Sequence, residues 1–448
     1  MKILHYALGF PPYRTGGLTK YCMDLMLTQK EEGHQVALMW PGQIGFFDKK
    51  IKIRQGKQWN DIQSFEVVNP LPVALDEGIV DTEAYMKSVD SKPYEELLKK
   101  YAPDVIHIHT LMGLHKEFLD IAKEINIRTI FTSHDYYGLC PKVTLFREGK
   151  SCDNDNDCAG CLKCNQFALS LKKIMLMQSP LYRVLKNTAI VKKLRQKHRR
   201  EFFEEQIPNE REVVSSSTTS SNDYKKLRSY YVNMLRKIDK IHFNSTLSEK
   251  VYRRYFEPKS SEVISITHRD IKDHRKIKDY NHEKLRLTYL GPAKPFKGFQ
   301  FLLEVLDELW KKGVQNFELQ IYTSTNENRP YITHQQDGYP YSQLEEIFDN
   351  TDLLVAPSVW YETFGFTVLE AMSYGVPVLV SENVGAKDLL NNETYGYELP
   401  INKDGFRKLL EDVCIERNKL KKCNWNIVDR FRINSMSHHN SKILKIYR

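Results

Sequence analysis

Short apolar runs alternate with longer amphipathic stretches along most of this chain. Continuous apolar runs are typical of buried strands, and apolar residues spaced about three or four apart are typical of helices. Their alternation predicts parallel strands joined by crossover helices, that is, an α/β protein. The expected strands are Ile3–Leu8, Val36–Trp40, Val105–His109, Thr129–Ser133, Ile241–Asn244, Leu285–Leu290, Phe317–Tyr322, Leu353–Pro357 and Val376–Val380, and the expected helices are residues 18–32, 114–124, 299–312, 341–349 and 366–374.

A polar, charged segment, Thr267–Glu283, separates the two α/β sets, and we interpret it as an interdomain linker. At 448 residues the chain is too long for one hydrophobic core. We therefore expect an N-terminal Rossmann-like acceptor-binding domain over residues 1–266 and a C-terminal Rossmann-like domain over residues 284–424. The remaining residues, 425–448, are amphipathic and are expected to pack back on the first domain.

The composition is that of an ordinary globular protein, with 41% hydrophobic and 11% aromatic residues. No run approaches the ~20 apolar residues that a membrane span needs. The opening Met1–Leu8 run is brief and lacks a small-residue cleavage site. We therefore expect a first strand and not a signal peptide, and a cytoplasmic protein.

The net charge of +9 is unevenly distributed. Residues 171–200 hold ten Lys or Arg and no acidic residue, and apolar side chains are interleaved with them. A basic amphipathic stretch favours an anionic membrane surface, which would place the protein at the inner face of the plasma membrane. A solvated helix face over the core is the equal alternative. No recognition motif accompanies the charge, so we expect no nucleic-acid partner.

Two acidic residues, Glu362 and Glu370, lie around a Phe364-Gly365 turn that opens a predicted helix. Carboxylates bind hydroxyls, and the unpaired N–H groups of a helix N-terminus bind phosphate. Glu370 lies in an otherwise apolar helix, where a carboxylate without a partner would be costly. A ribose diol would supply that partner, and a structural ion pair is the alternative. The arrangement predicts an enzyme that uses a nucleotide-diphosphate sugar.

Two glycine-containing loops each follow a predicted strand and precede a helix. Gly16-Gly17 allows the backbone to approach a phosphate or sugar closely, although a simple tight turn is the alternative. The pair does not match the G-x-G-x-x-G pattern, which argues against a dehydrogenase. The Gly291–Gly298 loop carries Lys297, which would neutralise a leaving diphosphate unless it is an ordinary surface lysine.

Histidines stand at the ends of two predicted strands. His109 ends the strand Val105–His109, and His134-Asp135 follows the strand Thr129–Ser133. Open α/β sheets bind their ligands at the carboxyl ends of the strands. A single histidine is usually structural, but two at neighbouring strand ends favour a ligand site.

Five of the eight cysteines fall in the segment 140–164, and their C-x-x-C spacings in a cytosolic chain favour a metal site over disulfides. Structural zinc is the first choice, and an iron–sulfur cluster or redox-active thiols are the alternatives. The loop lies just beyond His134 in the sequence and is expected to shape the acceptor side. The expected ligands are Cys158, Cys161 and Cys164 with Cys152 or Cys140.

These residues together resemble the retaining glycosyltransferases of family 4. That family has the GT-B architecture, in which two Rossmann-like domains face a central cleft. The similarity covers most of the chain and is most specific in the run from Glu362 to Pro377. Its other parts are Gly16-Gly17, Pro103–His109, His134-Asp135, Asn244-Ser245 and Lys297-Gly298.

The resemblance implies a role for each matching residue. Three would be catalytic: His109 touches the donor sugar, Glu362 lies near the transferred sugar, and Lys297 contacts the diphosphate. Glu370 would bind the nucleotide ribose. The other donor-binding residues would be Gly16, Gly17, Phe364, Gly365, Phe366 and Thr367, and His134 and Asp135 are candidate contacts for donor or acceptor.

The chain departs from the family pattern at two places. Pro292 stands where the family often has an arginine, so one phosphate contact is missing unless Lys294 supplies it. The segment Thr323–Asn328 replaces a glycine-rich turn, which changes the expected recognition of the base. The cysteine loop and the basic stretch enlarge the first domain, as in members that build bacterial surface polysaccharides.

The expected reaction is sugar transfer with retention, from a nucleotide-diphosphate sugar, UDP-linked, to a glycan or lipid-linked glycan. No Asp-x-Asp motif lies in the cleft segments, so no catalytic metal or other cofactor is expected beyond the structural zinc. One alternative is a non-catalytic, metal-containing membrane scaffold with a decayed site, motivated by Pro292 and the cysteines. Another is a phosphorylase of the same fold.

Overall fold

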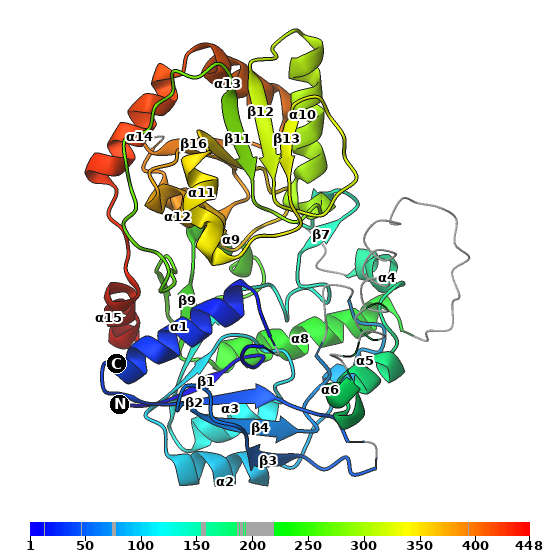
Figure 1. Ribbon diagram of the computed structural model, residues 1–448. Coiled ribbons are helices and arrows are strands. Elements are labelled where there is room, and N and C mark those ends of the chain that lie inside the picture. Colours follow the sequence, from blue (N-terminus) through cyan, green and yellow to red (C-terminus); the bar gives the residue numbers. More distant parts are fainter. Residues whose placement is uncertain are drawn as a thin grey trace.

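Two largely parallel sheets, one of eight strands and one of six, form the cores of two lobes (Figure 1). The computed structural model describes residues 1–185 except 13, 46, 74–77 and 154–157, the single residues 188, 191 and 193, and residues 219–448 except 393. The eight-stranded sheet defines the first lobe and the six-stranded sheet defines the second. Among the described residues, no helix has the length and apolar character needed to cross a bilayer.

The first sheet has the strand order β10-β9-β6-β5-β1-β2-β4-β3, and only the β3–β4 pair is antiparallel. Its strands alternate buried side chains between two covered faces, as expected for a parallel sheet. A separate hairpin, β7–β8, lies near the second lobe. The strands are β1 (Lys2–Tyr6), β2 (Gln35–Pro41), β3 (Lys52–Gln55), β4 (Gln63–Val68), β5 (Val105–Ile108), β6 (Arg128–Ser133), β7 (Phe146–Arg147), β8 (Lys150–Ser151), β9 (Lys240–Phe243) and β10 (Ser261–Val263).

Helices cover both faces of the first sheet. Apolar side chains of α2, α3 and α8 form one core with the sheet, and those of α1 and the C-terminal helix α15 form another on the opposite face. The helices of this lobe are α1 (Gly17–Glu31), α2 (Lys92–Tyr101), α3 (Lys116–Glu124), α4 (Ala159–Asn165), α5 (Leu171–Met177), α6 (Pro180–Leu185), α8 (Ser221–Lys237) and α9 (Thr246–Tyr252), with a 3₁₀ turn η1 (Glu83–Tyr85).

The second sheet has the order β13-β12-β11-β14-β15-β16 and is parallel throughout its described pairs. Helices α10 and α13 pack on one face, and α11 and α12 pack on the other. The strands are β11 (Leu285–Tyr289), β12 (Phe317–Ile321), β13 (Ile332–Gln335), β14 (Leu353–Ala356), β15 (Val378–Ser381) and β16 (Gly396–Leu399). The helices are α10 (Phe299–Lys311), α11 (Leu344–Asp349), α12 (Phe366–Ser373), α13 (Lys403–Ile415) and α14 (Asn418–Arg430), with 3₁₀ turns η2 (Pro295–Lys297), η3 (Tyr341–Gln343) and η4 (Gly385–Leu389).

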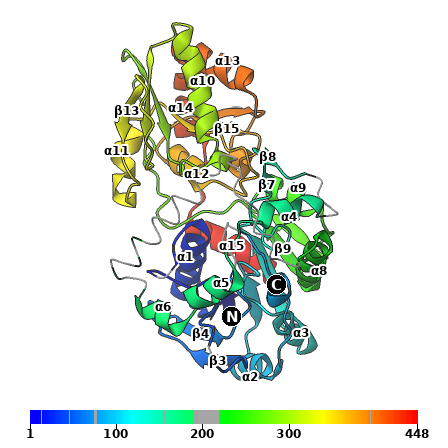
Figure 2. The same cartoon turned by 90° about the vertical axis from the view of Figure 1, so that its right-hand side faces the viewer.

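After the second lobe the chain returns to the first. Helix α14 leads out of the second lobe, and α15 (Met436–Ile446) lies along α1, as both views show (Figures 1 and 2). The Tyr21 hydroxyl and His439 Nε2 are 2.8 Å apart across this contact. The boundary expected between residues 424 and 425 therefore falls inside α14.

The two-lobe α/β fold expected from the sequence is confirmed. Each of the nine expected strands is present, with ends within two residues of the expected ones. The expected helix 341–349 divides into η3 and α11. In the basic stretch, residues 171–185 include α5 and α6, and most of the remaining residues, Lys192 and Arg195–Arg200 among them, lie outside the described part of the chain.

Candidate functional site

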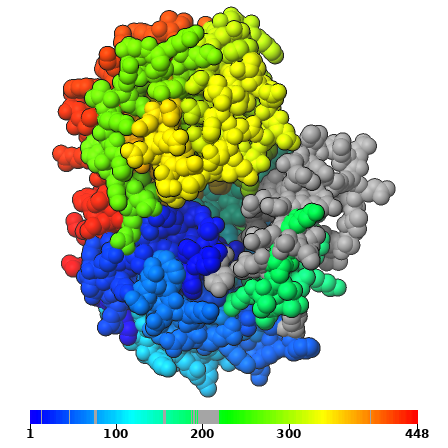
Figure 3. Space-filling view, in the orientation of Figure 1, coloured from blue at the N-terminus to red at the C-terminus, as the bar shows by residue number. Residues whose placement is uncertain are grey.

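The glycine loop of the first lobe faces a helix N-terminus of the second lobe. A Cβ added to Gly17 would stand 3.4 Å from the Phe366 ring, so a side chain there would fill the gap between the lobes. Gly365 precedes α12 and has φ +104, a conformation that favours glycine. The space-filling view shows a hollow where the lobes meet (Figure 3). Of the sequence-predicted donor-binding residues, Gly17 and Phe366 thus approach one another between the lobes.

Lys297 and Glu362 form an ion pair beside that helix N-terminus. The distance from Lys297 Nζ to Glu362 Oε1 is 2.5 Å, and the two side chains are 20% and 18% exposed. The Ser358 hydroxyl donates a hydrogen bond to the other carboxylate oxygen. The lysine also lies over the Trp360 ring, 5.1 Å from its centroid. The cation and the anion are therefore both partly buried and held in fixed positions at the N-terminus of α12.

Glu370 is buried on α12 and has a partner within the protein. The residue is 3% exposed, and its Oε1 lies 3.1 Å from Nε2 of His268 in the interdomain linker. Burial raises the pKa of Tyr341, and the nearby Glu370 carboxylate raises it further. The Tyr341 side chain also forms a hydrogen bond with Glu370. The carboxylate thus has a partner within the protein. A structural partner of this kind is the alternative to a bound ribose that the sequence left open. Neither partner was apparent from the sequence.

His109 lies below the cleft surface, and both of its ring nitrogens have partners. Its Nε2 is 3.0 Å from His5 Nδ1, and its Nδ1 is 3.3 Å from His134 Nε2. His109 is 0% exposed, whereas His134 is partly exposed. The His134 carbonyl accepts a hydrogen bond of 3.0 Å from the Thr363 hydroxyl of the second lobe. His134, and not His109, is therefore the histidine that stands at the interface between the lobes.

The hydrogen bonds of these histidines determine their tautomers. Gln29 Oε1 can only accept, so His5 Nε2, at 2.8 Å, carries the proton, and His5 Nδ1 accepts. His109 must then donate through Nε2, and its Nδ1 accepts from His134. The chain of bonds, which we call the histidine relay, continues from Gln29 through Tyr447, His107, Thr132 and His242 to the carbonyl of Ile264.

Burial keeps the histidines of the relay neutral. It lowers the pKa of His5 and His242 to about 4 and the pKa of His134 to about 3. The pKa values of His107 and His109 are also lowered by burial. Neutral rings can each donate one hydrogen bond and accept one, which is what the relay requires.

His5, His107 and His109 have the spacing of a metal site, but their nitrogens are already in use. Their ligand atoms lie within 4.8 Å of one another, and no other His, Cys, Asp or Glu group in the described part of the chain has this spacing. Each of the six ring nitrogens has a hydrogen-bond partner. Metal binding would break at least two of these bonds, so we interpret the group as a hydrogen-bonded layer.

Asp135 belongs to the loop that leaves this layer. Burial raises the pKa of its carboxyl to about 6. The carboxylate accepts a hydrogen bond from the Tyr137 N–H at 2.9 Å, and the Asp135 carbonyl accepts one from the Tyr252 hydroxyl at 2.5 Å. These bonds fix the start of the cysteine-rich loop. Both of them join Asp135 to residues of the first lobe.

The cysteine-rich loop, residues 140–164, also reaches the cleft. Its hairpin β7–β8 meets the second lobe, where the Ser151 hydroxyl donates to the Val359 carbonyl at 2.9 Å and the rings of Phe146 and Phe296 are 6.1 Å apart. These second-lobe residues adjoin Lys297 and Glu362. The eight cysteines are not joined by disulfides.

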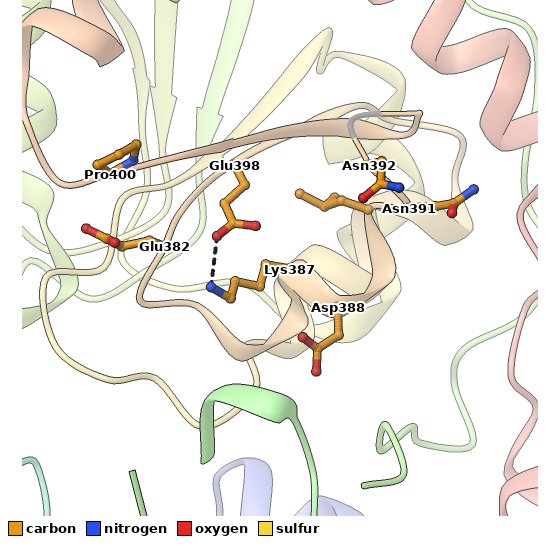
Figure 4. Close-up of a pocket in the computed structure, with 8 residues that line it drawn as sticks. Glu382, Lys387, Asp388, Asn391, Asn392, Glu398 and Pro400 are labelled. Carbon is orange, nitrogen blue, oxygen red and sulfur yellow. Dashed lines mark hydrogen bonds and ion pairs between the residues drawn. The ribbon is translucent and has the colours of Figure 1, made fainter. Parts of the chain in front are cut away.

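A separate pocket lies on the second lobe and contains none of the expected site residues (Figure 4). Lys387 and Glu398 pair across it at 2.8 Å. Asp388 points to the first lobe, where its carboxylate accepts hydrogen bonds from the N–H and hydroxyl of Thr246 at 2.7 and 2.5 Å. Beside this contact, the Ser245 hydroxyl donates to the Thr363 carbonyl at 2.5 Å. This region therefore fastens the two lobes together.

Two facing Rossmann-like lobes, with a glycine loop opposite a helix N-terminus, define the GT-B class of architecture. Residues 15–151 match the family described as Glycosyltransferase Family 4, and residues 270–427 match Glycosyl transferases group 1. The chain therefore belongs to the family 4 glycosyltransferases of the GT-B fold.

Three known proteins are similar to the chain, and the two solved structures among them share its fold. An uncharacterized 42.6 kDa protein in the cps region of Klebsiella pneumoniae is 23% identical over 304 residues, which are 67% of this chain and 62% of that protein. The chain thus matches about three fifths of that relative's length. WaaG, a glycosyltransferase involved in lipopolysaccharide biosynthesis, is 13% identical with a TM-score of 0.57 over 99% of both chains. Anabaena HepE, solved with UDP and glucose, is 13% identical with a TM-score of 0.54 over 100% of this chain and 99% of its own.

Proposed function

We propose that this protein is a retaining glycosyltransferase that moves a sugar from a nucleotide-diphosphate sugar to a glycan or lipid-linked glycan acceptor. The observation that carries the proposal is the Lys297–Glu362 pair at the N-terminus of α12, opposite Gly17 of the other lobe. A diphosphate in the cleft would meet a cation, the amides of a helix N-terminus and a loop without side chains. The sugar would lie beside the Glu362 carboxylate.

In the proposed reaction the bond between the sugar C1 and the phosphate oxygen breaks as the bond from C1 to the acceptor oxygen forms on the same face. The acceptor proton passes to the leaving phosphate oxygen. Negative charge collects on the diphosphate, where Lys297 and the α12 amides stabilise it. In this scheme Glu362 holds Lys297 in place and faces the positive charge that develops on the sugar.

We further propose a UDP-linked donor and a role in bacterial surface-polysaccharide synthesis. Three observations support these finer assignments. HepE, which shares the fold, is solved with UDP and glucose, and the Klebsiella relative is encoded in a cps region. WaaG, of the same fold, acts in lipopolysaccharide biosynthesis.

The test is a donor screen on the purified chain. We expect one nucleotide to raise the melting temperature, since a ligand that binds only the folded state stabilises it. The matching nucleotide sugar should then be hydrolysed slowly or transferred to acceptor, and NMR should show the anomeric configuration retained. Neither binding nor turnover with any donor would favour the non-catalytic scaffold, and turnover that requires inorganic phosphate would favour a phosphorylase.

We also propose that the first lobe docks on an anionic membrane surface through α6. Leu181 and Val184 on this helix are 54% and 77% exposed, and exposed Lys172 and Lys173 lie on the neighbouring helix α5, whereas Arg183 forms an ion pair with Glu66 at 2.6 Å. Exposed apolar side chains beside cations suit the interface of an anionic bilayer. Sedimentation with anionic liposomes should fall in a Leu181→Ser, Val184→Ser variant and persist in an Ile415→Ser control, where the residue is 76% exposed on the second lobe. Equal sedimentation of the two variants would contradict this docking surface.

A further inference from the structure

Glu362 lies between two neighbours that are both bound by the first lobe. On one side, Tyr361 is 8% exposed and packs in the apolar core of the first lobe. On the other side, the Thr363 hydroxyl donates to the His134 carbonyl at 3.0 Å, and the Thr363 carbonyl accepts from the Ser245 hydroxyl at 2.5 Å. The backbone that carries Glu362 is therefore anchored to the first lobe on both sides.

The Tyr361 hydroxyl belongs to a group of three polar side chains from three parts of the chain. It donates a hydrogen bond to the Asp153 carboxylate and accepts one of 3.3 Å from Nη1 of Arg254. The same Nη1 lies 2.8 Å from Asp153 Oδ1, and the guanidinium lies 4.9 Å from the centroid of the Tyr361 ring. We call these three residues the arginine latch. Asp153 follows the hairpin β7–β8 and Arg254 follows α9, so the latch joins two segments of the first lobe to the second.

The arginine of the latch does more than form an exposed ion pair, which alone would contribute little because water and salt screen it. The Arg254 and Asp153 side chains are 29% and 59% exposed, so this screening applies to their charges. The guanidinium adds two contacts, since it lies over the Tyr361 ring and donates to the Tyr361 hydroxyl. The buried tyrosine is therefore the part of the latch that the arginine fixes.

The hairpin β7–β8 holds the same stretch of the second lobe. It lies where the lobes meet in both views (Figures 1 and 2). The Ser151 hydroxyl donates to the Val359 carbonyl at 2.9 Å, two residues before Tyr361. Asp153 in turn is two residues beyond Ser151. The hairpin and the latch therefore act on one continuous stretch, residues 359–363.

We propose that Arg254 is a positioning residue for sugar transfer, which acts on Glu362 through Tyr361. The Glu362 carboxylate pairs with Lys297, and the Glu362 N–H donates to the Asn383 carbonyl at 2.8 Å. Because Tyr361 and Glu362 are consecutive, a shift of the tyrosine would move the Glu362 backbone and its carboxylate. The latch thus makes the position of a second-lobe carboxylate depend on the lobe that is expected to hold the acceptor. The effect on catalysis rests on the proposed function, whereas the anchoring of the segment does not.

The first experiment measures hydrogen exchange of backbone amides by mass spectrometry in the full chain without substrate. Arg254→Ala and Tyr361→Phe should each speed the exchange of peptides that cover residues 359–363, because this segment loses an anchor. Exchange there at the rate of the unsubstituted chain would overturn the proposal. The matched control is Arg253→Ala, which removes the preceding arginine and should leave the exchange of this segment unchanged. The partners of Arg253 all belong to the first lobe and are Glu249, Glu257 and Ser261.

The second experiment measures kcat and KM with the donor found in the screen. Arg254→Ala should lower kcat by about 10-fold or more with a much smaller change in KM, since a small misplacement of a group at the reacting centre is costly. Arg254→Lys should restore little of the rate, because an ammonium lacks the planar fork of a guanidinium. The loss in the double variant Arg254→Ala, Tyr361→Phe should be smaller than the product of the two single losses, because both substitutions remove one shared contact.

The outcomes separate the latch from the proposed function. An active chain in which Arg254→Ala and Arg253→Ala have the same kcat would overturn the positioning role and leave the proposed function standing. A chain that turns over no donor would contradict the proposed function, and faster exchange in Arg254→Ala would still show that the latch anchors the segment. If Arg254→Ala does not fold, Tyr361→Phe, which keeps the buried ring, decides the question.

Discussion

At the scale of single residues, the cleft depends on charges that the fold brings together from distant parts of the chain. Lys297 follows β11, whereas Glu362 follows β14, yet their charged atoms are 2.5 Å apart. Each side chain has a second neighbour, Trp360 for the lysine and Ser358 for the glutamate. Under the proposed function, charges fixed in this way would need little reorganisation when the diphosphate leaves.

We predict that Lys297→Ala lowers kcat by about 10²-fold or more, because it removes a fixed cation from the position where negative charge develops. KM for the donor should change much less. Steady-state kinetics with the donor found in the screen measure both values. Lys312→Ala, an exposed lysine that follows α10, is the control. An unchanged kcat would show that Lys297 is a spectator.

Glu370→Ala should instead act on donor binding. If its carboxylate accepts hydrogen bonds from the donor ribose, the loss is about 1.5–3 kcal/mol, which corresponds to an increase in KM of about 10- to 100-fold. Glu345→Ala, an exposed acid on α11, should leave KM unchanged. If Glu370→Ala lowers the melting temperature but not the affinity for donor, its bond to His268 is purely structural.

At the scale of elements, the sequence predicts those parts whose signal is local. The strands β14 and β15 are apolar over at least three consecutive residues, so their positions could be predicted directly from the sequence. The edge strands β3 and β13 are largely exposed and polar, and they carry no such signal. Pairing with a neighbouring strand defines them instead.

The same distinction applies to the site. The Lys297, Glu362 and glycine-loop positions were expected because their motifs are short stretches of sequence. The burial of His109 was not expected from the sequence. It depends on hydrogen bonds that run from His109 to His5, then to Gln29 and Tyr447, and these residues are distant from His109 in the chain. A usable signal did exist, since His107 and His109 are two residues apart in the expected strand Val105–His109 and should point to the same face.

Tyr447, the residue that follows helix α15, belongs to the histidine relay, and we predict that Tyr447→Phe destabilises the first lobe. The hydroxyl lies between Gln29 Nε2 at 3.0 Å and His107 Nδ1 at 2.6 Å, so its removal leaves two buried polar groups without this partner. The expected loss in the free energy of unfolding is about 1–3 kcal/mol, measured by urea denaturation. Ser441→Ala, on the exposed side of the same helix, is the control. Equal stability of the two variants would show that the relay contributes nothing.

At the scale of the whole molecule, the buried histidines make stability depend on pH. The pKa values of His5, His134 and His242 are about 4, 3 and 4 in the folded chain, against 6.5 in the unfolded chain. Below pH 6.5 the unfolded chain binds more protons, so stability falls as the pH decreases from about 6.5 towards 4. The loss is about 2 kcal/mol per histidine at pH 5.

Asp135 acts in the opposite direction. Its folded pKa of about 6 exceeds the unfolded value of 3.8, so the folded chain binds its proton first and gains stability as the pH falls from about 6 towards 4. One carboxyl cannot offset three histidines. We therefore predict a lower urea midpoint at pH 5 than at pH 7.5, and identical midpoints would contradict the assignment of neutral buried histidines.

The position of Tyr447 also bears on how the protein is made. Its hydroxyl belongs to the interior of the first lobe, but the ribosome adds it only after the entire second lobe has been synthesised. Domains generally fold in the order in which they emerge during synthesis. Here the first lobe emerges before α15, so its histidine layer still lacks the Tyr447 hydroxyl at that stage. The lobe reaches its final form only when α15 docks.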